Sequence, residues 1–208
     1  DLIYALPDES LFTLKSDLNT MLKLGITHVS TYSLIIEEHT MLYNNGTKSI
    51  DELLDYKMYK YICKKLKKRG FHHYEVSNFS LPGYESKHNL IYWDNNEYYG
   101  FGLGAHGYIN EMRYENTRNF NKYLKGKYRL NELLVSTQEE MENEVILGLR
   151  KLDGISISEF NNRFKKDIFD VFKLDEAIKR KYLIMNGDKI YIPEDKIYVM
   201  NEIINMIL

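Results

Sequence analysis

The chain has 208 residues, of which 44% are hydrophobic and 28% charged, and its formal net charge is −2. A chain of this length can bury a sizeable core, in one large domain or two small ones. No stretch reaches the roughly 20 apolar residues of a membrane span and no signal peptide is apparent, so a cytoplasmic protein without a transmembrane segment is expected. The near-neutral charge disfavours a surface dedicated to nucleic acid.

The first elements alternate between strand and helix. Residue 1 is Asp, and it opens directly into the apolar run of residues 2–6, which is typical of a buried strand. A buried strand normally has neighbours on both sides, and a parallel one needs a crossover before it. We therefore interpret the chain as a C-terminal fragment. A helix over residues 9–24 and a strand over residues 28–36 follow.

A second helix is predicted from about residue 50 to Gly70, because Ser49 and Glu52 have the spacing of a capping box. Residues 74–79 are predicted as a third strand. The alternation of strands and helices predicts a parallel β/α arrangement.

Ligands of parallel β/α folds bind at the carboxyl ends of the strands. In this chain we expect Asp1, Glu37 or Asn78 to project there. A binding site is thus predicted along one edge of the first 80 or so residues.

Two short stretches concentrate the residues suited to binding chemistry. Residues 88–93 (His-Asn-Leu-Ile-Tyr-Trp) and 100–107 (Gly-Phe-Gly-Leu-Gly-Ala-His-Gly) hold the single tryptophan and two of the six histidines. Glycine allows close approach of backbone to a ligand, while His, Tyr and Trp offer a nitrogen ligand and flat apolar faces. This combination favours a flat cofactor or a nucleotide-like ligand.

The last part of the chain no longer alternates between strands and helices and has a mainly helical pattern. Residues 111–135 are interpreted as a connecting segment, and residues 136–208 as a small helical domain that begins with a capping box of Thr137 and Glu140. Two short helices precede a hairpin at Asn186-Gly187, and a final helix follows from about residue 194. Helices followed by a hairpin resemble a winged helix, but the acidic residues of its recognition segment disfavour binding to nucleic acid.

Cysteine and the remaining histidines set limits on metal chemistry. The single cysteine, Cys63, excludes an internal disulfide and a cysteine cluster built from this chain alone. His72 and His73 precede a predicted strand without a matching partner residue, and we expect both on the surface.

Several motifs together resemble a known family. The chain is similar to the radical S-adenosylmethionine proteins related to oxygen-independent coproporphyrinogen III oxidase, and within them to the heme-chaperone branch. The motifs that carry the resemblance are, in chain order, Asp1-Leu2-Ile3-Tyr4 with Leu6-Pro7; Ser30, Tyr32, Leu34, Glu37 and Thr40; Tyr74-Glu75-Val76-Ser77-Asn78-Phe79; Pro82-Gly83; His88-Asn89-Leu90-Ile91-Tyr92-Trp93; and residues 100–107.

The resemblance implies an α/β fold. Residues 1–110 would form the C-terminal part of a partial (β/α)6 barrel, residues 111–135 a connection, and residues 136–208 a helical, winged-helix-like C-terminal domain. In the family a [4Fe-4S] cluster, held by a CxxxCxxC motif in the first part of the barrel, generates a radical from S-adenosylmethionine. That motif is absent here, so this part of the protein would be inactive alone.

The resemblance also implies two sets of site residues. Asp1, Ile35 and His106 match positions that contact S-adenosylmethionine in the oxidases, with the alternative that Asp1 is a chain end without a role. The second set is associated with heme and comprises His88, Asn89, Tyr92 and Trp93, with His88 as an axial iron ligand. The alternative is that His88 and Asn89 only form hydrogen bonds in a loop while Trp93 fills the core.

Two functions follow from the family. The first is a heme chaperone that passes heme to an acceptor protein, in which the cluster and S-adenosylmethionine govern the transfer. The second is the oxidative decarboxylation of coproporphyrinogen III in porphyrin biosynthesis. Residues 88–93 and the histidine within residues 100–107 favour the chaperone, and they leave open whether the intact protein is also an enzyme.

Overall fold

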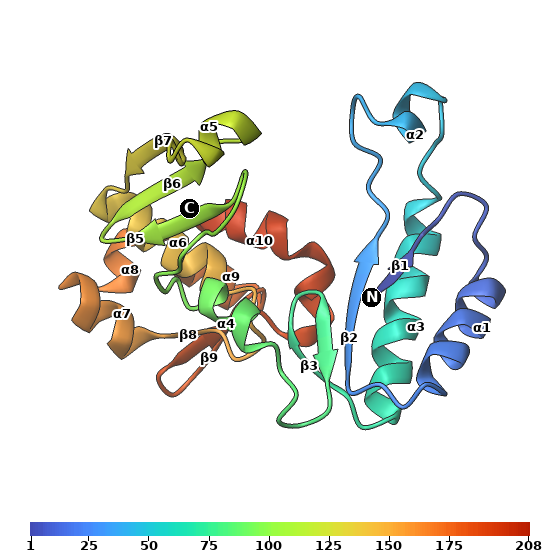
Figure 1. Ribbon diagram of the computed structural model, residues 1–208. Coiled ribbons are helices and arrows are strands. Elements are labelled where there is room, and N and C mark those ends of the chain that lie inside the picture. Colours follow the sequence, from blue (N-terminus) through green and yellow to red (C-terminus); the bar gives the residue numbers. More distant parts are fainter. The chain divides into compact units, whose positions relative to one another are not determined.

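The computed structural model describes all residues from Asp1 to Leu208, which divide into two compact units, Asp1–Glu85 and Ser86–Leu208 (Figure 1). The first unit contains β1 (Leu2–Tyr4), α1 (Leu11–Leu22), β2 (His28–Ser33), α2 (Met41–Asn44), α3 (Glu52–Lys68), β3 (His72–Glu75) and β4 (Asn78–Ser80). None of the helices in the chain combines the length and apolar character that crossing a membrane requires.

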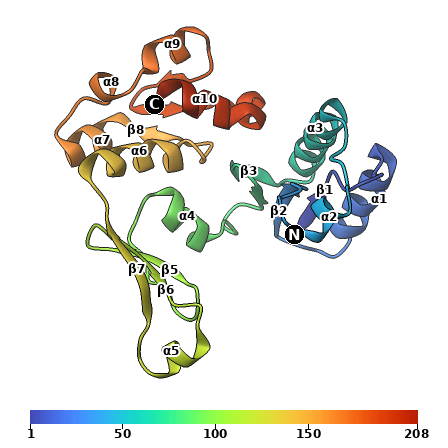
Figure 2. The same ribbon diagram turned by 90° about the horizontal axis from the view of Figure 1, so that it is seen from above.

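The first unit is a four-stranded sheet with two long helices packed on it. The strand order is β1-β2-β4-β3, and α1 and α3 lie side by side in Figures 1 and 2. Leu14 and Leu18 of α1 are fully buried, as are Met58 and Ile62 of α3. Their helical spacing explains why both helices form and which side of each faces the core.

The N-terminus of α3 corrects one expectation. Its cap is Asp51, whose side chain accepts a hydrogen bond from the backbone N–H of Leu54 at 3.1 Å. The predicted capping box of Ser49 and Glu52 is therefore wrong. Asp is as good an N-cap as Ser, so the two candidates could not be separated by residue type.

The expected third strand is a hairpin. β1 and β2 are parallel as predicted, with Ile3 beside Tyr32, but β4 runs antiparallel to both β2 and β3. The chain turns at Val76 and Ser77. Ser77 is a common turn residue, but neither Gly nor Pro, the strongest turn signals, is present. The prediction of a single strand over residues 74–79 was wrong for that reason.

The second unit begins with a helix and an antiparallel sheet. Its first elements are α4 (Lys87–Trp93), β5 (His106–Ile109), β6 (Met112–Asn116), α5 (Phe120–Leu124) and β7 (Arg129–Leu134). The sheet order is β5-β6-β7, and Figure 2 shows β6 and β7 side by side, with β6 running toward α5 and β7 returning from it.

This sheet bears on the expected three-part division of the chain. The predicted boundary at residue 110 falls in the turn of the β5–β6 hairpin, and the connecting segment 111–135 contains two paired strands. The division into residues 1–110, 111–135 and 136–208 stays a proposal about the intact protein.

The rest of the second unit is helical with a small wing. It contains α6 (Thr137–Gly148), β8 (Ile155–Ser156), α7 (Ile157–Phe164), α8 (Ile168–Val171), α9 (Leu174–Lys179), β9 (Ile184–Asn186), β10 (Lys189–Tyr191), the 3-10 helix η1 (Glu194–Val199) and α10 (Met200–Ile207). The predicted hairpin is confirmed, although its turn is Gly187-Asp188 and not Asn186-Gly187, because Asn186 pairs with Lys189. It joins β8 in a sheet of order β8-β10-β9. This is the winged-helix-like pattern expected from the sequence.

Candidate functional site

The motif of residues 88–93 forms most of a short helix. Ser86 caps α4 by accepting a hydrogen bond from the backbone N–H of Asn89 at 3.3 Å, and the helix ends at Trp93. Because His88 and Tyr92 are four residues apart, they lie on the same face of the helix. Seven residues are enough to present both side chains from one rigid element.

His88 is exposed and already has one partner. Its Nε2 atom lies 3.0 Å from the hydroxyl oxygen of Tyr92, and the two rings meet edge to face with centroids 4.8 Å apart. The ring of Tyr92 makes a second edge contact with Tyr98, at 4.5 Å. An iron atom at His88 Nε2 would therefore have to replace a hydrogen bond to Tyr92.

Asn89 and Trp93 lie on the more buried part of the helix. Both are half-buried, and the guanidinium of Arg150 lies 5.3 Å from the centre of the Trp93 ring. The indole Nε1 of Trp93 is buried and has no hydrogen-bond partner. Such an unpaired donor is uncommon in a packed core and costs free energy. Trp93 thus packs against other residues of its own unit, and its contact with heme stays a prediction.

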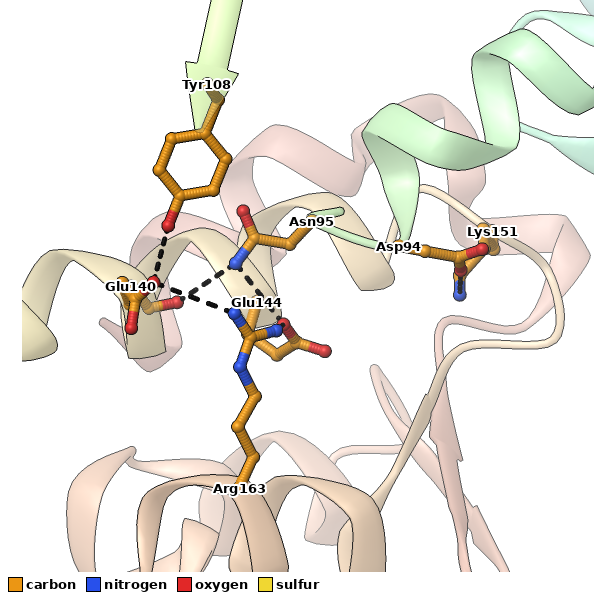
Figure 3. Close-up of polar contacts among 7 residues, drawn as sticks. All are labelled: Asp94, Asn95, Tyr108, Glu140, Glu144, Lys151 and Arg163. Carbon is orange, nitrogen blue, oxygen red and sulfur yellow. Dashed lines mark hydrogen bonds and ion pairs between the residues drawn. The ribbon is translucent and has the colours of Figure 1, made fainter. Parts of the chain in front are cut away.

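A polar network holds the segment that follows α4 (Figure 3). Asp94 forms an ion pair with Lys151, and Asn95, which is only 4% exposed, donates hydrogen bonds to the Glu144 side chain at 3.3 Å and to the backbone oxygen of Glu140 at 3.5 Å. These contacts anchor the end of α4 to α6.

The network continues to α7 and β5. Arg163 of α7 lies 2.8 Å from Glu144 and 3.7 Å from Glu140, and the hydroxyl of Tyr108 donates to Glu140 (Figure 3). Burial, reinforced by the hydrogen bond to Glu140, raises the pKa of Tyr108 to about 12. Burial also raises the pKa of Glu144, although Arg163 opposes it. The network therefore fixes the position of the helix that carries residues 88–93.

Sequence reasoning missed this network and misassigned one of its members. Glu140 was expected to complete a capping box with Thr137, but the box is formed by Ser136 and Glu139. A shift of one residue leaves Glu140 free of the cap and turns it toward Tyr108. The spacing of Ser136 and Glu139 was a signal that could have identified the cap.

The glycines of residues 100–107 serve local packing. The backbone N–H of Gly100 donates to the Tyr114 hydroxyl at 2.8 Å, and a Cβ at Gly100 would lie 2.1 Å from the backbone oxygen of His106. A Cβ at Gly107 would lie 2.1 Å from the ring of Tyr114. Larger side chains are excluded at both positions because the backbone of this loop packs against β5 and β6.

Asp1, Ile35 and His106 are the residues matched to S-adenosylmethionine. Asp1 and Ile35 belong to the first unit but lie apart in it, and His106 belongs to the second unit. Asp1 is exposed and precedes β1, whereas Ile35 follows β2 and is 72% exposed. Because the strands are parallel and Leu2 pairs with Thr31, Asp1 lies roughly 16 Å along the sheet from Ile35. His106 belongs to the second unit, where it is exposed and lies 4.0 Å from Glu115. Contact of these residues with the cofactor stays a prediction.

The expected projection of polar residues at strand carboxyl ends was wrong for two residues. Asp1 stands at the amino end of β1, and Asn78 is 2% exposed within the sheet, where it begins a strand antiparallel to β2. Glu37 follows β2 and is exposed. The turn at Val76 and Ser77 makes Asn78 the first residue of β4 and not the end of a longer strand, while Asp1 precedes β1 in the sequence itself.

The predictions about metal ligands and about His72 and His73 can also be compared with the structure. No group of three or more His, Cys, Asp or Glu side chains could hold a metal ion, and Cys63 lies half-buried in α3. The residues present therefore do not fit an iron–sulfur cluster. His72 is exposed beside Glu85 as expected, but His73 is 8% exposed and stacks on Phe79 at 4.1 Å. Its predicted surface position was wrong because the β3–β4 hairpin was not foreseen.

The chain is similar to known proteins in both sequence and fold. Residues 135–194 match the HemN C-terminal domain. The structure also matches that of coproporphyrinogen III oxidase (HemN) from Escherichia coli, described as a radical SAM enzyme, with a TM-score of 0.81 over 99% of this chain and 53% of that one, at 13% identity. The predicted fold class is confirmed, as is the predicted resemblance to the coproporphyrinogen III oxidase-like family.

Its similarity within that family is to heme chaperones. Over its full length the chain is 40% identical to the heme chaperone HemW of Lactococcus lactis subsp. lactis (strain IL1403) and 36% identical to the heme chaperone HemW of Bacillus subtilis (strain 168). It covers 57% and 58% of these relatives, so it spans little more than half of their length.

Proposed function

We propose that the protein is a heme chaperone that binds heme and delivers it to an acceptor protein. The observation that carries this proposal is that the exposed imidazole of His88 and the half-buried phenol of Tyr92 lie together on one face of α4. A neutral imidazole is a common axial ligand of heme iron. The similarity over the whole chain to relatives named heme chaperone HemW supports the same function.

The residues of α4 fit a heme in part. His88 is accessible, and its Nε2 needs to give up only a hydrogen bond to Tyr92 to take an iron atom. Asn89 and Trp93 are half-buried, so any contact from them comes from the edge of the helix. Bound heme would supply the iron, and the chain would supply the ligand and an aromatic flank.

The second part of the proposal concerns the other cofactors. The intact protein would use S-adenosylmethionine and a [4Fe-4S] cluster, as its resemblance to that family implies. The thiolates for a cluster would lie outside these 208 residues, which contain one cysteine. Asp1, Ile35 and His106 are the proposed contacts to S-adenosylmethionine.

The experiment is a heme titration of the full-length protein, followed in the Soret band. His88→Ala should lower the affinity for heme by about tenfold or more, equal to about 1.4 kcal/mol of binding free energy. It should also change the position of the band, because the axial ligand is lost. Tyr92→Phe should bind heme at least as well, because it frees His88 Nε2.

The matched control is His72→Ala, which removes another exposed histidine. Equal behaviour of His88→Ala and His72→Ala would contradict the proposed ligand. Turnover of coproporphyrinogen III by the protein with its reduced cluster, unaffected by His88→Ala, would instead select the oxidase.

A further inference from the structure

The second unit has a pocket that the proposed function does not use. It has a volume of about 610 Å³ and lies between the glycine-rich loop and the β6–β7 strands. That volume is in the range of small-molecule and cofactor sites. Its lining is dominated by aromatic side chains and a cation, namely Tyr99, Phe101, Tyr114, Tyr123, Tyr128 and Arg129. No residue of α4 lines it.

The floor of the pocket is rigid. Tyr114 and Asn116 of β6 are 7% and 3% exposed. Asn116 donates hydrogen bonds to the backbone oxygens of Gly100 at 3.1 Å and Gly102 at 2.9 Å, and Tyr114 accepts one from Gly100. Because the loop and the strand are tied together by buried groups, the shape of the floor exists before any ligand arrives.

The walls are two pairs of aromatic rings. Tyr99 and Phe101 stack with centroids 5.9 Å apart, and Tyr123 meets Tyr128 edge to face at 4.9 Å. Tyr99 is 69% and Phe101 84% exposed, although apolar rings are normally buried. Exposed aromatic surface gathered around a pocket is typical of a binding site for a flat ring.

The charge of the lining selects an anion. The guanidinium of Arg129 lies 3.4 Å from the centre of the Tyr114 ring and donates to Asn116 at 2.6 Å, so it is held in place. Lys127 adds a second positive charge. No carboxylate lines the pocket, and Glu132, outside the lining, accepts a hydrogen bond from Arg129 Nε at 3.2 Å. Arginine and lysine at the same pocket favour carboxylate or phosphate groups.

We propose that this pocket binds a planar aromatic ring that carries carboxylates, and that in this protein the ligand is a porphyrin. The aromatic pairs would contact the ring, while Arg129 and Lys127 would contact the propionates. The choice of a porphyrin rests on the proposed heme-chaperone function. The pocket itself recognises ring and carboxylates, so binding does not depend on iron or on His88.

The test uses iron-free protoporphyrin IX as the probe, with its fluorescence followed during titration into the full-length protein. Phe101→Ala and Lys127→Glu should each raise the Kd by about tenfold or more. The matched controls are Phe12→Ala, since Phe12 is 81% exposed elsewhere, and Lys125→Glu, which reverses an exposed charge outside the lining. Both controls should leave the Kd within about twofold of the unmodified protein.

A second arm tests the role of the carboxylates. With the dimethyl ester of the same porphyrin, Lys127→Glu should have no effect, while Phe101→Ala should still weaken binding. Equal Kd values for Phe101→Ala and Phe12→Ala, or for Lys127→Glu and Lys125→Glu, would overturn the inference. Unchanged emission of Trp93 in each variant would show that the second unit is folded.

His88→Ala separates this inference from the proposed function. It should weaken heme binding but leave the Kd for the iron-free porphyrin unchanged. Porphyrin binding that depends on Phe101 and Lys127, without iron ligation by His88, would retain the pocket and reject the iron ligand. Heme binding that depends on His88 but is unchanged in Phe101→Ala and Lys127→Glu would retain the iron ligand and reject the pocket.

Discussion

The two units differ in how completely they bury their apolar side chains. In the first, Tyr4 and Val29 are buried, but the opposite face of the sheet leaves Ile3 51% and Tyr32 45% exposed side by side. In the second, Phe160 is 2% exposed and contacts two further phenylalanines. A sheet needs cover on both faces to bury all its apolar residues. Residues 86–208 close a core of their own, whereas β1 and β2 expose apolar side chains on one face of the first sheet.

The largest expected effect tests this difference directly. Phe160→Ala removes a fully packed ring and should lower the free energy of unfolding of the second unit by about 3–5 kcal/mol. Tyr32→Ala, on the uncovered face, should lower stability by less than about 1 kcal/mol. Denaturant unfolding checks both, because Trp93 is the only tryptophan and its emission reports on the second unit, while far-UV circular dichroism reports on the whole chain. Similar losses in the two variants would break the comparison.

The second largest effect on stability is expected at Gly154, which packs against β10. At Gly154 the backbone φ is +69°, and a Cβ would lie 2.0 Å from the backbone oxygen of Ile190. Gly154→Ala should therefore destabilise the second unit by about 2 kcal/mol or more, from left-handed strain and overpacking together.

The control for that variant is Gly187→Ala. Gly187 has φ +60° but nothing within 4 Å of its Cβ position, so only the strain of about 1 kcal/mol should appear. Thermal unfolding followed by Trp93 emission measures both. If Gly154→Ala were no worse than Gly187→Ala, close packing of the wing would be refuted.

The polar network should contribute a smaller amount. Asn95→Ala leaves the buried side of Glu144 without its amide donor and should cost about 1–3 kcal/mol. Asn96→Ala, at the neighbouring exposed position, should be nearly neutral. The Asn95 variant should also weaken heme binding, because Asn95 holds the end of α4. Unchanged stability and unchanged heme affinity in Asn95→Ala would show that the network does not position the helix.

The smallest effect is a pH dependence. Burial raises the pKa of Glu144 from the ordinary value of 4.5, so the native state keeps its proton at a pH where the unfolded chain has lost it. The stabilising contribution is complete below pH 4.5 and is lost as the pH rises through the folded pKa. Glu144→Gln cannot titrate, so its stability relative to the unmodified protein should increase over that interval.

Glu139→Gln provides a control of opposite sign. Hydrogen bonds from the backbone and side chain of Ser136 lower the pKa of Glu139, so its contribution is present above the ordinary pKa of 4.5 and lost as the pH falls through the folded value. The stability of Glu139→Gln relative to the unmodified protein should therefore decrease as the pH rises. Urea unfolding at a series of pH values measures both variants, and slopes of the same sign would reject the assignment.

The candidate site was predictable in position but not in detail. Residues 88–93 and 100–107 were identified from residue type alone, and the structure places the first on α4 and the second before β5. The hydrogen bond between His88 and Tyr92 follows from their spacing on a helix. The network from Asn95 to Arg163 had no such signal, because its members lie 45 to 49 residues apart or on separate helices.

What the sequence determined by itself is the set of local elements. Leu14 and Leu18 define the buried side of α1, and Asn186-Gly187 predicts the hairpin to within one residue of its turn. Each depends on contacts between residues only a few positions apart. Only the tertiary structure decided that β4 runs antiparallel to β2 and that His73 is buried. Strand direction and burial depend on which distant segments meet, and periodicity along a single segment carries no information about its partner.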